Sequence, residues 1–258
     1  WRADATRYAA ALAVAAVLAL ACGLTLLRAL AAEFDHDEHQ FVTPAILFWR
    51  GEMPFLSYLY LHMPLAGLIY APAALLPDPF LGARITAGLL AVGVLLLLFL
   101  HGRRSLGGGA AGALAAGGAT VLLASAPAFV HTAGLTWNHA SSVLPAVAAF
   151  MLLLHGTAAH RPWALVAAGV ALGLAISCRL TAAPLLAPFG LGLLFLGRDL
   201  SLRRVLARIL LLGLGAAAAM LPVLVCLVAT PEAFLAGNFE YPRLSTVFHR
   251  EHGRVWDW

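Results

Sequence analysis

Acidic and histidine side chains gather in one short segment of an otherwise apolar chain. Residues 33–39 read Glu-Phe-Asp-His-Asp-Glu-His and hold four of the twelve acidic residues. A carboxylate pair such as Asp37–Glu38 could hold a proton, bind a cation or act as a general base on a hydroxyl group. Alternatively, the pair lies in a solvated loop and only helps to set the topology of the chain. His36 and His39 add metal-ligating side chains, but their spacing matches no established zinc site.

Two arginines and one polar dipeptide are further candidates for binding. Arg84 opens a predicted helix, and Arg179 lies in a short hinge between two others. Either guanidinium could bind a lipid phosphate through two hydrogen bonds, or it could anchor its helix end by snorkelling to the membrane surface. Asn138 and His139 lie in a loop without acids. They could face the same cavity as Asp37, or they could cap the helix that follows.

The composition indicates that most of the chain is surrounded by membrane. Hydrophobic residues make up 62% of the chain and charged residues 11%, and residues 106–130 contain no ionisable group. Such stretches cannot remain in water, so the sequence predicts an all-α polytopic membrane protein. The net charge of +4 is small and scattered, which argues against a nucleic-acid partner. The three cysteines each lie in an apolar run and are interpreted as buried hydrophobic residues.

Seven apolar segments approach the roughly 20 residues that a helix needs to cross a bilayer, namely 8–32, 84–100, 106–130, 140–155, 162–178, 180–197 and 207–230. A further segment, 63–76, is shorter, begins with Met-Pro and is followed by Pro77, which favours a helix on the membrane surface. The first segment is longer than the roughly 7–15 residues of a signal-peptide core. It is therefore interpreted as a retained signal anchor.

The arginines determine the predicted orientation. With 63–76 on the surface, nine of the sixteen arginines fall in four segments on one side, which the positive-inside rule assigns to the cytoplasm. The N-terminus is then cytoplasmic. The large loop 33–83, with surface helices at 41–50 and 63–76, lies outside together with the stretch 231–258. The chain is expected to be a single transmembrane domain, 1–258, that continues beyond the given sequence.

Motifs in the first outer loop resemble those of GT-C glycosyltransferases. They are Asp37-Glu38-His39-Gln40, then Gly51-Glu52-Met53-Pro54-Phe55, Tyr58 and His62-Met63-Pro64-Leu65. The pattern is most similar to the bacterial branch near protein O-mannosyltransferases and lipid A aminoarabinose transferases, in which an Asp-Glu pair follows the first span. Downstream, residues 168–175 and 178–184 resemble the Gly-rich helix and the basic hinge of that family.

The resemblance implies an inverting transfer of a sugar from a polyprenyl-phosphate donor to an acceptor hydroxyl, at the outer face of a bacterial inner membrane. The acceptor would be a lipid, a glycan or a protein. Asp37 and Glu38 would form the catalytic pair, and Arg179 would contact the donor phosphate. The other expected substrate-binding residues are Arg84, His62, Asn138 and His139. No cofactor is required, and a divalent metal at Asp37 and Glu38 is left open, although Asn138-His139 stand where some relatives carry a second acid.

A multi-span transporter or lipid flippase is the main alternative. Transporters usually place ionisable residues near the middle of the bilayer. No predicted span carries an acid or an arginine near its middle. Polar residues concentrated at one surface therefore favour an enzyme that uses a lipid-borne substrate, while a non-catalytic membrane subunit is a third interpretation.

Overall fold

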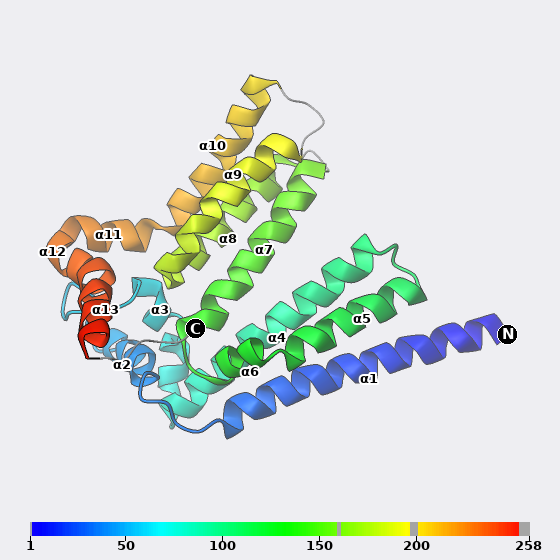
Figure 1. Cartoon of the computed structure of the whole chain (residues 1–258), viewed down its shortest axis with the longest axis horizontal. Coiled ribbons are helices and arrows are strands. Elements are labelled where there is room, and N and C mark those ends of the chain that lie inside the picture. Colours follow the sequence, from blue (N-terminus) through cyan, green and yellow to red (C-terminus); the bar gives the residue numbers. More distant parts are fainter. Residues whose placement is uncertain (1, 159–160, 197–200, 253–258) are drawn as a thin grey trace.

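The computed structural model describes residues 2–158, 161–196 and 201–252, and these residues form helices without a β-strand. Figure 1 shows two groups of helices that diverge from a common base like the arms of a V. The first arm consists of α1 (Arg2–Ala31), α4 (Pro79–Ser105) and α5 (Ala110–Ser125). The second arm consists of α7 (Asn138–Ala158), α8 (Pro162–Cys178), α9 (Leu186–Phe195) and α10 (Leu202–Ala219).

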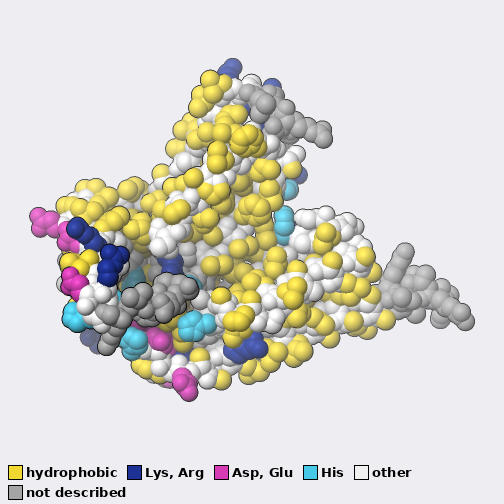
Figure 2. Space-filling view, in the orientation of Figure 1, with side chains coloured by type: hydrophobic (Ala, Val, Ile, Leu, Met, Phe, Trp, Pro, Cys, Tyr) yellow, Lys and Arg dark blue, Asp and Glu magenta, His cyan; other side chains and the backbone are white. Residues whose placement is uncertain are grey.

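The base contains the shorter elements, which are α2 (His39–Phe48), α3 (Pro64–Leu68), α11 (Leu221–Ala229), α12 (Pro231–Leu235) and α13 (Tyr241–Glu251). A 3-10 turn, Ala71–Leu75, follows α3 and leads to α4, and a π-helical segment, Ala236–Glu240, joins α12 to α13. A second 3-10 turn, Leu180–Leu185, joins α8 to α9 in the second arm. Helix α6 (Pro127–Gly134) joins the first arm to the second. The acidic side chains visible in Figure 2 gather over the base.

Several helices could cross a membrane. Among the described residues, α1, α4 and α7 are each long and apolar enough, and the number rises to five if each of two bent helix pairs counts as one span. These helices agree with the predicted all-α membrane protein. The predicted total of seven spans would also require the shorter apolar helices Pro162–Cys178 and Leu180–Phe195 to cross, and it stays a prediction.

Prolines divide the third and the seventh predicted spans. Helices α5 and α6 meet at 67°, and α10 and α11 meet at 61°. Pro127 and Pro222 have no N–H to continue a helix, and proline disfavours helical backbone in the residue before it. Ala126 accordingly adopts an extended conformation, with φ −63° and ψ 127°. The Arg28 guanidinium donates to the carbonyl oxygen of Ala124 at 3.1 Å and so satisfies a helix end that the bend leaves open.

Both predicted surface helices of the first loop are present as helical segments. Segment 41–50 corresponds to α2, and segment 63–76 forms α3 and the following 3-10 turn. The indole of Trp49 donates to the carbonyl oxygen of Ala71 at 2.6 Å and holds the two together. The loop ends where the Asp78 carboxylate caps the first turn of α4.

Glycines allow the helices of the arms to approach closely. A Cβ atom added at Gly169 of α8 or Gly215 of α10 would lie 2.0 or 2.1 Å from a backbone oxygen of the facing helix. The backbones of α8 and α10 are therefore in direct contact. The two arms meet where Leu144 of α7 packs against Gly93 of α4.

Candidate functional site

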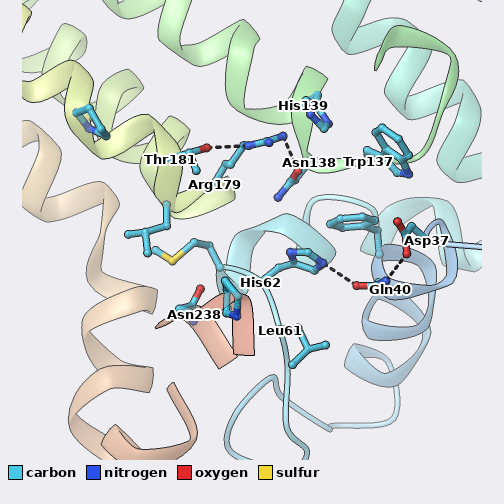
Figure 3. A pocket seen from close by; sticks show the side chains of 15 residues that line it. Asp37, Gln40, Leu61, His62, Trp137, Asn138, His139, Arg179, Thr181 and Asn238 are labelled. Atoms are coloured by element: carbon cyan, nitrogen blue, oxygen red, sulfur yellow. Dashed lines mark hydrogen bonds between the residues drawn. The ribbon is translucent and has the colours of Figure 1, made fainter. Parts of the chain in front are cut away.

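A cavity of about 460 Å³ lies where the base meets the second arm. Its walls come from α2, the loop before α3, the start of α7, the hinge after α8 and the segment that leads into α13. Five of the seven predicted site residues line it, namely Asp37, His62, Asn138, His139 and Arg179. Figure 3 shows these side chains around a common space, although the chain separates them by up to 142 residues (179 − 37).

The other two predicted residues, Glu38 and Arg84, lie outside this cavity and pair with each other. Glu38 is fully buried, and the Arg84 side chain is 11% exposed. The guanidinium donates from Nε to Oε1 at 3.1 Å and from Nη2 to Oε2 at 2.6 Å. Arg84 also donates to the carbonyl oxygens of Ala32 and Glu33. Four of its five N–H donors are therefore engaged with protein groups, and its expected role as a substrate contact stays a prediction.

Both oxygens of the Glu38 carboxylate are fully used. Beside the two bonds from Arg84, Oε1 accepts from the Thr136 N–H at 2.9 Å and Oε2 from the Asp35 N–H at 3.2 Å. Burial alone would raise the pKa of Glu38, but the hydrogen bonds from Arg84, Thr136 and Asp35 outweigh it, so the pKa lies below its ordinary value. Glu38 is thus held as a structural anion whose lone pairs are already used by protein donors, and its expected place beside Asp37 in catalysis stays a prediction.

Asp37 points in a different direction from its neighbour. The residues 36–38 form a turn, in which the Asp37 N–H donates to Oδ1 of Asp35 at 2.8 Å. The Asp37 side chain is 43% exposed and lines the cavity. Its Oδ1 accepts from Nε2 of Gln40 at 2.6 Å, whereas Oδ2 makes no hydrogen bond with the described residues. One carboxylate oxygen is therefore held in place and the other is available to a ligand.

Arg179 supplies a positive charge to the cavity. It follows the last residue of α8 in an extended conformation, with φ −153° and ψ 116°, which turns its side chain away from the helix axis. Its Nε donates to the Thr181 hydroxyl at 2.8 Å, and its Nη1 donates to Oδ1 of Asn138 at 3.2 Å. Partial burial lowers the pKa of Arg179, but a guanidinium remains protonated in proteins. Within the described residues no carboxylate pairs with it.

The amide of Asn138 links the start of α7 to this hinge. Beside the bond from Arg179, its Nδ2 donates to the carbonyl oxygen of Cys178 at 3.5 Å. Of the two expectations for Asn138, the structure thus favours the side chain that faces the cavity over the helix cap. His139 packs its ring 5.3 Å from that of Trp137, and its Nδ1 is buried without a partner among the described residues.

His62 occupies the cavity wall between α2 and the hinge. Its Nε2 lies 2.8 Å from Oε1 of Gln40, and its ring stacks on Phe41 at 4.8 Å. Burial lowers the pKa of His62 to about 4; Asp37 acts against this shift and Arg179 adds to it. The imidazole is therefore neutral at physiological pH.

Three polar residues of the cavity were not among the predicted site residues. Gln40 belongs to the motif that begins at Asp37, so a sequence signal for it existed. Thr181 follows Arg179 in the hinge. Asn238 is buried in the π-helical segment, where its Nδ2 donates to the carbonyl oxygen of Phe234 at 3.1 Å. Only the fold brings Asn238 to the cavity, because nothing near it in sequence resembles a site.

The acidic segment could bring three ligand atoms near one cation. One atom each of Asp35, His36 and Asp37 lies within 4.8 Å of the others. However, Oδ1 of Asp35 already accepts the Asp37 N–H, and Asp37 accepts from Gln40. The His36 side chain is 87% exposed. This arrangement is that of a solvated turn, and the expectation that no cofactor is required stays a prediction.

Comparison of the chain with models of known protein families, with curated proteins and with solved structures finds no match.

Proposed function

We propose that this cavity binds a sugar linked to polyprenyl phosphate and transfers the sugar to an acceptor hydroxyl, as GT-C glycosyltransferases do. One observation carries the proposal. A single cavity contains both Arg179, which has no carboxylate partner among the described residues, and Asp37, whose carboxylate has a free oxygen. The donor phosphate needs a positive charge such as that of Arg179, and the reacting hydroxyl needs a base such as the carboxylate of Asp37.

Arg179 would bind the donor phosphate. A guanidinium forms strong charge-assisted hydrogen bonds with phosphate oxygens, and Arg179 retains donors beyond those given to Thr181 and Asn138. Apolar residues next to it, Leu180 and Pro184, also line the cavity and offer a surface to the prenyl chain. The phosphate gains charge as it leaves, so a fixed positive charge stabilises the transition state as well as the bound donor.

Asp37 would act on the acceptor. The acceptor oxygen forms a bond to the anomeric carbon, the bond from that carbon to the phosphate oxygen breaks, and the phosphate keeps the electron pair. Oδ2 of Asp37 takes the hydroxyl proton, a role that accelerates reactions roughly 10²–10⁴-fold. Attack opposite the leaving phosphate inverts the anomeric centre.

The position of the cavity favours an enzyme over a transporter. It lies at the ends of α7 and α8, and its charged groups belong to the base and the hinge rather than to the middle of a helix. Arg103 and Arg104 lie in the last turn of α4, at the helix end away from the base. With those arginines in the cytoplasm, the cavity opens at the outer face of a bacterial inner membrane, where lipid-linked sugars are used.

Transfer and donor binding test the proposal in the protein reconstituted in nanodiscs. Asp37→Asn should abolish transfer from a panel of polyprenyl-phosphate sugars while the protein stays folded. Arg179→Ala should weaken binding of undecaprenyl phosphate by roughly 10- to 100-fold, as expected for hydrogen bonds to a charged group. Arg179→Lys should retain part of the affinity. Arg50→Ala, at an exposed arginine of the base, is the control. Unchanged transfer in Asp37→Asn and unchanged binding in Arg179→Ala would refute the proposal.

A further inference from the structure

Gln40 connects Asp37 to His62, and the chemistry of the three side chains fixes the direction of each hydrogen bond. An ionised carboxylate only accepts hydrogen bonds, so the group of Gln40 that lies 2.6 Å from Asp37 must be its NH₂. The amide oxygen of Gln40 then faces Nε2 of His62 at 2.8 Å. Since that oxygen can only accept, Nε2 of His62 carries the proton.

The remaining ring nitrogen of His62 is therefore a hydrogen-bond acceptor. A neutral imidazole protonated at Nε2 has a lone pair at Nδ1. Nδ1 has no hydrogen-bond partner among the described residues. It is also not fully buried, and His62 lines the cavity, so a ligand there can reach it.

The groups around His62 keep it neutral. Burial lowers its pKa to about 4, Asp37 partly offsets the effect and Arg179 reinforces it. The rings of Phe41 and Tyr60 pack against the imidazole at 4.8 and 5.7 Å. Tyr60 brings no charge, because burial raises its pKa well above the ordinary value.

We propose that Asp37, Gln40 and His62 act as one hydrogen-bonded unit, in which Gln40 orients the carboxylate and fixes the His62 tautomer so that Nδ1 accepts a hydrogen bond from a substrate hydroxyl. Gln40 is a positioning residue, and His62 is a binding residue. In hydrolytic triads an aspartate fixes the histidine tautomer directly; here the Gln40 amide stands between the two. The inference rests on the proposed function, because it names a second hydroxyl-binding group in the same cavity.

Nitrogen NMR of the protein with ¹⁵N-labelled histidine tests the unit without any turnover. The His62 signals are assigned by their loss in His62→Gln. In the wild type, Nε2 should be protonated and Nδ1 unprotonated from pH 8 down to pH 5. Gln40→Met keeps a side chain of similar length but removes both hydrogen bonds, so His62 should become a mixture of the two tautomers. Gln40→Glu still accepts from Nε2 but adds a negative charge, so His62 should become protonated at a higher pH than in the wild type. His155→Gln, which changes an exposed histidine in the last turn of α7, should leave the His62 signals unchanged.

Octyl glucoside provides hydroxyl groups on an alkyl chain that suits the apolar wall. Its addition should move the Nδ1 signal upfield with saturation, and Gln40→Met should weaken this binding by about 3- to 10-fold, the range for one neutral hydrogen bond. A wild-type ring protonated at Nδ1, or a tautomer unaffected by Gln40→Met, would overturn the unit. An Nδ1 signal that ignores the glycoside would overturn its hydroxyl-binding role. If the His62 tautomer is fixed as described but the protein transfers no sugar, the proposed function is contradicted and the hydrogen-bonded unit is not.

Discussion

Glu38→Gln should destabilise the protein far more than Asp37→Asn, although the two substitutions make the same chemical change at consecutive residues. Glu38 is fully buried, whereas the Asp37 side chain is 43% exposed. The Glu38 carboxylate accepts four hydrogen bonds, two of them from Arg84. A glutamine offers one accepting oxygen, and its NH₂ group would face N–H donors that it cannot satisfy.

The size of the effect follows from the charge that is left behind. Removing one partner of a buried ion pair destabilises a protein by about 3–5 kcal/mol, because the other charge stays buried without compensation. Arg84 is 11% exposed and keeps its bonds to two carbonyl oxygens, so we expect the lower end, about 3 kcal/mol. Asp37→Asn retains an acceptor for Gln40 and should change the stability by less than about 0.5 kcal/mol, as most surface substitutions do.

Thermal unfolding in detergent, followed with a thiol-reactive dye, measures the difference, because Cys178 and Cys226 are buried in the fold and react when it opens. The double variant Glu38→Gln/Arg84→Met should be more stable than Glu38→Gln alone, since it removes the unpaired charge. If the free energy of unfolding of Glu38→Gln lies within about 1 kcal/mol of the wild-type value, or is no lower than that of Asp37→Asn, the ion pair does not stabilise the fold as described.

Two further perturbations test other parts of the structure. The pKa of His62 in the folded protein, about 4, lies below its ordinary value of 6.5, so the unfolded chain binds the proton more readily. The free energy of unfolding should therefore fall as the pH drops from 6.5 to 4, by roughly 3 kcal/mol at most. His62→Gln should lack this part of the pH dependence in unfolding measured across that range, whereas an unchanged profile would contradict the neutral buried ring. Gly215→Ala should destabilise the protein by about 1–3 kcal/mol because its Cβ would meet the Val166 carbonyl oxygen 2.1 Å away. A Cβ added at Gly213 on the same helix meets none of the described residues within 4 Å, so Gly213→Ala should be neutral or stabilise by up to about 1 kcal/mol. Equal unfolding temperatures for the two variants would contradict the close packing of α8 and α10.

The sequence was sufficient to locate the helices but not their bends or the partners of the acids. Runs of apolar residues predict each long helix, because burial or contact with lipid requires them. Pro127 and Pro222 stand at the two bends, but the apolar runs pass through them and predict one uninterrupted span in each case. Asp37 and Glu38 cannot be distinguished in this way. Which of them is buried depends on Arg84, 46 residues further along, and on the Thr136 N–H, 98 residues away.

The residues of the cavity, too, could be predicted from the sequence only in part. Residue type identifies Asp37, Arg179 and the Asn138-His139 pair as candidates, because polar side chains are rare in this chain. Gln40 belongs to the motif that begins at Asp37, but its type alone does not mark it as a site residue. Asn238 has no such signal, and only the fold brings it to the cavity. The order in which a carboxylate, an amide and an imidazole share hydrogen bonds is a property of the three-dimensional arrangement, which no spacing in the sequence encodes.

The buried ion pair also bears on how activity measurements should be interpreted. Glu38 joins the second turn of α4, through Arg84, to the loop before α7, through Thr136, and its own turn carries Asp37. Thr136 stands two residues before Asn138, so the pair supports both walls of the cavity. A Glu38 variant should therefore lose sugar transfer even if Glu38 never touches the substrate. Measurements of activity alone would therefore not distinguish Glu38 from Asp37, and both would be interpreted as catalytic because they are adjacent in the sequence. Only a variant that loses transfer while keeping the unfolding temperature of the wild type identifies a group that acts in the reaction, and Asp37→Asn is expected to be that variant.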